Sequence, residues 1–145
     1  MSDAANGYVV ADAIRVTYQG VVADNDTSSY EVLSGVWDPA TGVSGYFGQN
    51  YRTHPAGTGT AVVRWHLGVP ASGMYQVAVW YAEHPNRASN ARYTVGTTTV
   101  TVDQRDHGGQ WVSLGDFWLT QDTTVTLSDA ANGYVVADAV RLIPT

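Results

Sequence analysis

The chain has 145 residues, of which 44% are hydrophobic and 11% aromatic, which suffices for one ordinary core but not for two. Its formal net charge of -6 argues against nucleic acids and anionic membrane surfaces, since both need clustered positive charge. It has no cysteine and no lysine, which excludes disulfides, thiolate metal sites, cysteine nucleophiles and Schiff-base chemistry.

No targeting or membrane segment is predicted. Met1 is followed by Ser-Asp rather than by a basic and then an apolar run, as a signal peptide would require. No apolar stretch approaches the roughly 20 residues that a membrane span needs, so we expect no membrane insertion. If the parent protein is exported, we expect its signal to lie outside this chain.

The first segment of the chain is repeated at its end. Residues 2–16 read SDAANGYVVADAIRV and residues 128–142 read SDAANGYVVADAVRL, with apolar swaps at Ile14/Val140 and Val16/Leu142 only. No second full repeat lies between them. We interpret the chain as one complete unit preceded by the last strand of another, from a tandem array. The predicted parts are a terminal strand of a preceding repeat (1–16), a short linker (17–20) and a single β-sandwich domain (21–145).

Between the two copies, apolar and polar residues alternate with period two in runs rich in Val, Thr, Tyr and Trp, which is typical of half-buried strands. In chain order, the predicted strands are 21–24, 30–33, 60–67, 74–81, 92–95, 98–102, 111–118 and 123–127. Turn residues such as Asp38-Pro39 and Gly108-Gly109 separate them, and no amphipathic helix stands out. The pattern predicts an all-β fold, an antiparallel β-sandwich of jelly-roll type with a duplicated terminal strand.

The last predicted strand runs over residues 134–142 and carries an acidic residue among apolar ones. Strand alternation places Tyr134, Val136, Asp138, Val140 and Leu142 on one face. A buried Asp138 would need a partner, such as an arginine or backbone N–H groups. We therefore interpret Asp138 as a structural anchor rather than a catalytic residue.

The turn Asp24-Asn25-Asp26 is the one candidate for a metal. Its oxygen-bearing side chains leave two alternatives, a structural Ca²⁺ held by Asp24 and Asp26 or a turn that these residues make unaided. The spacing of an EF-hand loop is missing. We favour the unaided turn and predict no cofactor.

Several segments together carry a resemblance to a known family. They are VVADND at 21–26, SGVW at 34–37, GYFGQNYR at 45–52, SGMYQVAVWY at 72–81, NRASNARYTV at 86–95, VDQRDHGGQWVSLGDF at 102–117 and VTLSDAANGYVVADAVRL at 125–142. In these the chain resembles the golvesin C-terminal-like domain, a β-sandwich module also found at the end of xanthan lyases. The resemblance implies a non-catalytic accessory module, thought of as carbohydrate-binding, on secreted or surface proteins. It carries over no ligand residues.

Aromatic and amide side chains near the predicted loops are the candidates for sugar contacts, because an aromatic ring packs well on the apolar face of a pyranose. An acidic polysaccharide would in addition pair with Arg87, Arg92 or Arg105. The alternative is that the tyrosines pin loops to the sheet, and Trp65, in phase with Val63 and Leu67, is predicted to be core. The predicted ligand-binding residues are Tyr46, Tyr51, Trp80, Tyr81, Asn86, Arg87, Asn90, Gln104, Arg105, Gln110 and Trp111.

No catalytic constellation can be assembled from the sequence. The four histidines are scattered without an HExxH pattern, and Tyr46 stands where Ser44 would need the second glycine of a GxSxG elbow. We predict a non-enzyme: an extracellular or cell-surface carbohydrate-binding module of a tandem-repeat protein, whose partner is a polysaccharide or cell-surface glycan.

The duplicated strand supports an alternative of another class. A sandwich that ends in GYVVADAVRL has one slot for that strand, whereas the chain has two copies. If the copies exchange between molecules, the protein is a structural or adhesive repeat that self-associates into oligomers or filaments. The predicted assembly residues are Tyr8, Val10, Asp12 and Ile14 in the first copy and Tyr134, Val136, Asp138 and Val140 in the second.

Overall fold

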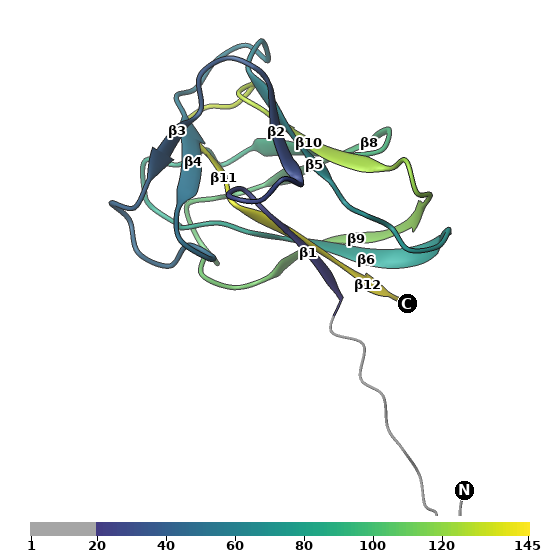
Figure 1. Ribbon diagram of the computed structural model, residues 1–145. Coiled ribbons are helices and arrows are strands. Elements are labelled where there is room, and N and C mark those ends of the chain that lie inside the picture. Colours follow the sequence, from purple (N-terminus) through teal and green to yellow (C-terminus); the bar gives the residue numbers. More distant parts are fainter. Residues whose placement is uncertain (1–19) are drawn as a thin grey trace, which may run out of the picture.

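The computed structural model describes residues 20–145, which form three antiparallel sheets (Figure 1). One sheet has the order β1 (Val21–Asp24), β12 (Ala139–Pro144), β6 (Gly73–Trp80) and β9 (Val112–Leu119). The second has the order β2 (Tyr30–Ser34), β5 (Val62–His66), β10 (Thr124–Ser128), β7 (Ala91–Val95) and β8 (Thr98–Val102). The third contains β11 (Val135–Ala137), β4 (Tyr51–His54) and β3 (Asp38–Ala40). The predicted all-β antiparallel sandwich is confirmed.

The two larger sheets are stacked face to face, with the small sheet at one end of the sandwich (Figure 1). Their inner faces form the core, in which Trp65 and Tyr93 stack with ring centroids 6.2 Å apart. Val77 on β6 and Val140 on β12 are fully buried on the opposing side. The prediction that Trp65 lies in the core is confirmed. Within residues 20–145, no helix is long and apolar enough to span a membrane.

The eight strands predicted before the terminal run are all present, with boundaries that differ by at most two residues. Two strands were missed, β3 and β4. The prediction of a turn at Asp38-Pro39 is wrong, because both residues belong to β3 and pair with β4. β3 is an edge strand, and an edge tolerates proline because the missing N–H faces away from the ladder.

The terminal segment, residues 134–142, was predicted as one strand but forms two. β11 pairs with β4 in the small sheet, and β12 pairs with β1 and β6 in the four-stranded sheet. Asp138 is the residue at which the chain passes from one sheet to the other. The predicted single-face alternation is therefore wrong: Val135, Val136 and Ala137 are all fully buried, whereas the side chain of Tyr134 is 43% exposed. The first copy of this segment lies outside the described residues.

Candidate functional site

The outer face of the four-stranded sheet carries the aromatic side chains that are not used by the core. On β6, Tyr75, Val77 and Val79 are buried between the sheets. Strand alternation therefore turns Met74, Gln76, Ala78 and Trp80 to the outside. The neighbouring strands add Arg141 from β12 and Asp116 and Trp118 from β9, because these residues pair with outward positions of β6.

A β-bulge in β9 brings two tryptophans to this same face. Trp111 and Trp118 are an odd number of residues apart and would lie on opposite faces of a regular strand. The register shifts where Gly115 pairs with Val77 and Ser113 with Ala78, which leaves Leu114 as the extra residue. Gly115 has a φ of 125°, a conformation that favours glycine. The bulge thus reverses the phase between Trp111 and Trp118.

Three rings form a cluster at one end of the face. The centroids of Trp80 and Trp111 are 5.3 Å apart, and Phe47 lies 5.5 Å from Trp80 and 5.4 Å from Trp111. Edge-to-face and tilted pairs of this kind stabilise one another beyond the area that they bury. The indole Nε1 of Trp80 donates a hydrogen bond of 2.8 Å to the carbonyl of Gly45, which fixes the loop that carries Phe47. All three rings keep part of their surface exposed.

Arg141 lies against this cluster. Its guanidinium carbon is 4.8 Å from the centroid of the Trp111 ring, a cation–π distance. Among residues 20–145 no carboxylate forms an ion pair with it, and its buried Nε has no hydrogen-bond acceptor. Burial lowers the pKa of Arg141 below its usual value.

The other end of the face presents the most exposed tryptophan. Trp118 is 64% exposed and pairs across the ladder with Met74, which is 43% exposed. Met74 and Trp80 are six residues apart on β6, so the two ends of the face are about 20 Å apart. We call the surface formed by Phe47, Met74, Trp80, Trp111, Trp118 and Arg141 the outer aromatic face. A surface of this length accommodates an extended oligosaccharide.

A pair of buried carboxyls holds the loop behind the aromatic cluster. Asp138 is fully buried and its Oδ2 accepts a 2.8 Å hydrogen bond from the backbone N–H of Phe47. The partner predicted for Asp138 is thus a backbone N–H, with Asp24 as a second neighbour and no arginine among the described residues. With its amide NH₂ directed at the acceptors around it, Asn25 donates to Oδ1 of Asp24 (2.9 Å) and of Asp138 (3.3 Å).

Burial dominates the electrostatics of this carboxyl pair. It raises the pKa of Asp138 to about 8, helped by the neighbouring Asp24, and the pKa of Asp24 to about 7. Near neutral pH at least one of the two carboxyls is therefore protonated. Asp26, the second candidate ligand in the calcium alternative, is exposed. No group of three or more His, Cys, Asp or Glu in the described part of the chain is placed to hold a metal ion.

Four of the predicted ligand residues are buried and serve the fold. Gln104 is fully buried, with its NH₂ donating to Tyr93 Oη and Val136 O (both 2.9 Å) and its Oε1 accepting from Val136 N (2.8 Å). The other three, Tyr51, Tyr81 and Arg87, are at most 6% exposed. Arg87 donates through Nε to Ala82 O and stacks on Tyr51, so its charge is occupied within the fold. These four side chains are therefore too buried to contact a ligand directly.

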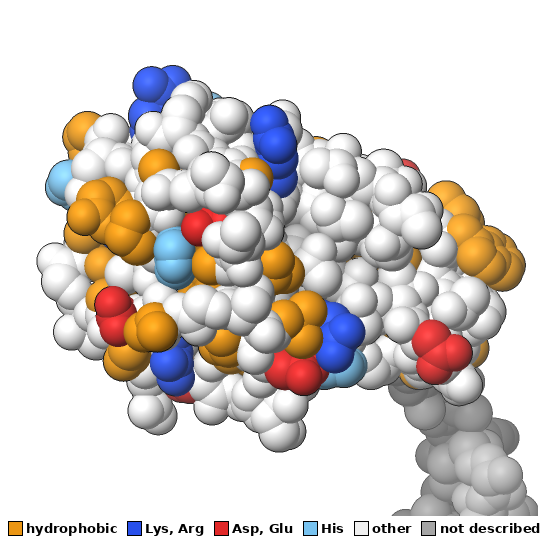
Figure 2. Space-filling model, turned by 90° about the horizontal axis from the view of Figure 1, so that it is seen from above, with side chains coloured by type: hydrophobic (Ala, Val, Ile, Leu, Met, Phe, Trp, Pro, Cys, Tyr) orange, Lys and Arg blue, Asp and Glu red, His pale blue; other side chains and the backbone are white. Residues whose placement is uncertain are grey.

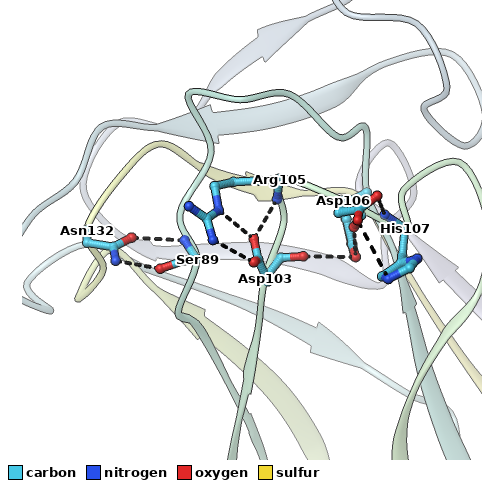
Figure 3. Close-up of polar contacts among 7 residues, drawn as sticks. Ser89, Asp103, Arg105, Asp106, His107 and Asn132 are labelled. Atoms are coloured by element: carbon cyan, nitrogen blue, oxygen red, sulfur yellow. Dashed lines mark hydrogen bonds and ion pairs between the residues drawn. The ribbon is translucent and has the colours of Figure 1, made fainter.

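Two other predicted residues, Arg105 and Asn90, lie in a cluster of loops, part of which is drawn in Figure 3. Arg105 donates two hydrogen bonds of 2.9 Å to the carboxylate of Asp103. These bonds lower the pKa of Asp103 to about 2. Asn132 joins the adjacent loop through both atoms of its amide, accepting from Ser89 N (2.9 Å) and donating to Ser89 Oγ (2.6 Å). Asn90 Oδ1 accepts from Asn132 N (2.9 Å). These contacts are the local bonds that keep exposed loops in shape.

The remaining predicted residues divide between the two regions. Trp80 and Trp111 belong to the outer aromatic face, while Asn86 and Gln110 are exposed in loops. Tyr46 is partly buried and packs on Tyr51, with ring centroids 5.8 Å apart. Of the predicted assembly residues, Tyr134 is exposed and the other three of the second copy are buried; those of the first copy lie outside the described residues.

The face over the five-stranded sheet is different in character. Figure 2, which views the molecule from above, shows a right half that is mostly white apart from an orange group at its edge, and a left half where hydrophobic and charged side chains are interspersed. Nearby, Arg64, His66, Leu67 and the turn at residues 121–124 line a hollow of about 410 Å³. Glu31 binds Arg64 (2.9 Å) and His66 (2.8 Å) beside it. No aromatic ring of the phenylalanine, tyrosine or tryptophan type lines this hollow, so it lacks a stacking surface.

The ligand-binding residues predicted from the sequence do not include Phe47, Met74, Trp118 and Arg141. Regular alternation along the predicted strand 111–118 would put Trp111 and Trp118 on opposite faces, and the only local signal for the bulge is Gly115 within the strand. Nothing in the sequence pairs Arg141 with Trp111.

Comparison with known proteins gives the family. The family model of the Golvesin C-terminal domain matches residues 21–144. Xanthan lyase of Bacillus sp. (strain GL1) is 35% identical over 134 residues, which cover 85% of this chain and 14% of that protein. The structure of Paenibacillus xanthan lyase matches with a TM-score of 0.79 and 36% identity, covering 86% of this chain and 13% of that one.

Carbohydrate-binding modules share the fold at lower identity. The family 35 carbohydrate-binding module from Clostridium thermocellum matches with a TM-score of 0.64 and 17% identity, covering 88% of this chain and 100% of that one. The chain spans only a small part of the lyases but the full length of this module. The chain belongs to the Golvesin C-terminal domain family and has a β-sandwich fold like that of carbohydrate-binding modules.

Proposed function

We propose that this domain is a non-catalytic module that binds polysaccharide along its outer aromatic face. The observation that carries the proposal is the alignment of Trp118 at one end of an exposed sheet face with the Phe47, Trp80 and Trp111 cluster at the other. Aromatic rings at the two ends of this face can stack against separate pyranose units of one extended chain, and the polar side chains of Gln76 and Asp116 between them offer hydrogen bonds.

The relatives support a carbohydrate partner. The similar proteins include a lyase named for xanthan and modules named for carbohydrate binding, and this chain resembles the non-catalytic modules over their full length. We also propose that the protein is located outside the cell or on the cell surface, where such polysaccharides occur. The proposed role is to hold an attached protein on its glycan.

The test is binding of a panel of neutral and acidic polysaccharides, measured by affinity gel electrophoresis and titration calorimetry. We expect Trp118→Ala to weaken binding by about tenfold, since one stacked ring contributes about 1–2 kcal/mol. The matched control is Tyr134→Ala, which removes a 43% exposed aromatic side chain outside the face. Loss of binding in the Tyr134 variant with full binding in the Trp118 variant would move the site to the loops. Complete absence of binding across the panel would refute the function.

We propose self-association through the duplicated strand as a second function. β12 lies between β1 and β6 and buries Val140 and Leu142. The first copy has Ile14 and Val16 at the equivalent positions, so one swap adds a methylene and the other removes one. The total volume offered to the slot is conserved, and volume-conserving apolar swaps cost little. The two copies are therefore close in energy as occupants of the slot.

Light scattering over a concentration series tests this second proposal. If strands exchange, the full chain has a mass that rises with concentration, and a variant lacking residues 2–16 stays a monomer at every concentration. An identical mass for the two proteins throughout the series would rule out exchange.

A further inference from the structure

Arg141 lies on the outer aromatic face beside the aromatic cluster. In the register of the sheet it pairs with Ala78 on β6 and Val22 on β1. Ala78 has no long side chain, so the arginine can extend over it toward Trp111, 4.8 Å from the guanidinium carbon. Ala78 is only 1% exposed, in agreement with a side chain lying over it. The charge is thus presented beside the rings that would stack on a sugar.

The polar atoms of this guanidinium are poorly satisfied within the described residues. The partly exposed Arg64 and the exposed Arg105 each form an ion pair with a carboxylate at 2.9 Å. Arg141 forms no ion pair with any carboxylate of residues 20–145, and its buried Nε has no acceptor there. The ring of Trp111 attracts the charge but accepts no conventional hydrogen bond. A partly desolvated cation in this state gains more from an anion than a fully solvated one does.

The geometry narrows the chemical class of that anion. Because the Nε is buried while the side chain as a whole is partly exposed, the accessible part is the end with the two Nη groups. That end matches the two oxygens of a planar carboxylate and forms paired hydrogen bonds with it. The flanking rings of Trp80 and Trp111 match the apolar face of the sugar ring that would bear the carboxylate.

We propose that the outer aromatic face is selective for polysaccharides that contain uronic acids, with Arg141 binding the uronate carboxylate. This inference rests on the proposed binding of glycans by the same face. It assigns the acidic-sugar contact to Arg141. The three arginines that the sequence suggested for binding an acidic polysaccharide do not lie on this face. Arg87 is buried, Arg105 is paired with Asp103, and Arg92 lies on the opposite sheet.

The experiment compares matched ligands that differ only in charge. Polygalacturonate, alginate and hyaluronan are tested against their carboxyl-reduced forms, in which each carboxylate is replaced by a CH₂OH group, by titration calorimetry at two salt concentrations. We expect the wild-type protein to prefer at least one acidic form by about tenfold over its reduced form. The preference should shrink as salt rises, since it depends on charge.

Variants then assign the preference to a residue. Arg141→Gln should lose the preference for the acidic form and keep its affinity for the reduced form. Arg141→Lys keeps the charge without the planar fork and should retain a reduced preference. Trp118→Ala should weaken binding of both forms alike. Near-UV circular dichroism of the tryptophans establishes that each variant is folded, and Arg141→Lys carries the test if the glutamine variant is not.

The outcomes separate this inference from the proposed function. If the wild-type protein binds the acidic and reduced forms equally, the role of Arg141 is overturned while glycan binding by the face stands. The same conclusion follows if Arg141→Gln lowers the affinity for both forms equally. No binding of any polysaccharide overturns both. A preference for the acidic form that survives in Arg141→Gln also contradicts the inference.

Discussion

At the scale of single residues, the fold strongly changes the protonation of two buried carboxyls, Asp24 and Asp138. Burial raises the pKa of both well above the value of 3.8 that an exposed aspartate has. The hydrogen bond from Phe47 N to Asp138 joins this pair to the loop that carries part of the aromatic cluster. Gly48 in the same loop has a φ of 67° and packs so closely on Asp24 that a Cβ there would collide with its carboxylate. The protonation of the pair is therefore coupled to the shape of that loop.

We expect the free energy of unfolding to fall as the pH rises from 5 to 8. The folded pKa values lie above the unfolded ones, so in this range the native state binds more protons than the unfolded state, and stability is lost as the pH rises through the folded values. Because both carboxyls have raised folded pKa values, the native state holds up to two more protons than the unfolded state, and the slope can approach about 2.7 kcal/mol per pH unit below pH 7. Urea denaturation at several pH values measures it. Asp138→Asn should flatten the slope, and the exposed control Asp116→Asn should leave it unchanged. A wild-type stability that rises with pH contradicts the assignment.

Two glutamines near the Gly108-Gly109 turn differ in their importance for stability. Gln104 makes three buried hydrogen bonds, whereas Gln110 is exposed. Removing Gln104 leaves buried donors and acceptors without partners, so Gln104→Ala should lower the free energy of unfolding by about 3 kcal/mol. Gln110→Ala should change it by less than about 0.5 kcal/mol. Urea denaturation of the two variants is the measurement, and similar losses in both would contradict this division.

At the scale of elements, strands with clear period-two alternation were predictable from the sequence, and strands that depend on tertiary context were not. β3 contains a proline and has only three residues, and it pairs with β4 in a small sheet in which β4 also pairs with the distant strand β11. The terminal run was predicted as one strand because nothing local marks the change of sheet at Asp138. The bulge in β9 had a local sign, Gly115, but its effect on the faces depends on the register with β6.

The bulge offers a direct test of how the two tryptophans reach one face. Gly115→Ala should lower the free energy of unfolding by about 1–3 kcal/mol, because alanine is strained at a φ of 125° although its Cβ would meet only ordinary contacts. Gly42→Ala is the matched control, since a Cβ there meets nothing within 4 Å and the φ is not positive. Equilibrium unfolding in urea compares the two. A Gly115 variant as stable as the Gly42 variant would mean that the bulge does not require glycine.

At the scale of the whole molecule, the outer aromatic face is assembled from segments far apart in the sequence. It draws on the loop before β4, on β6, β9 and β12, and the order of these strands follows from non-local pairing. Trp80 and Trp111 were predicted from residue type alone, and their partners Phe47 and Arg141 emerge only from the fold. The start of β1 pairs with the end of β12, so both lie at one end of the domain (Figure 1).

The measurement that tests the central claim most directly is an NMR titration with polysaccharide, following the indole N–H signals of the five tryptophans. Binding along the outer aromatic face should shift the signals of Trp80, Trp111 and Trp118. The signals of Trp37 and Trp65, which are 3% and 0% exposed, should stay in place and serve as internal controls. Shifts confined to the loops at residues 86–90 and 103–110, with the three indole signals of the face unmoved, would contradict the account.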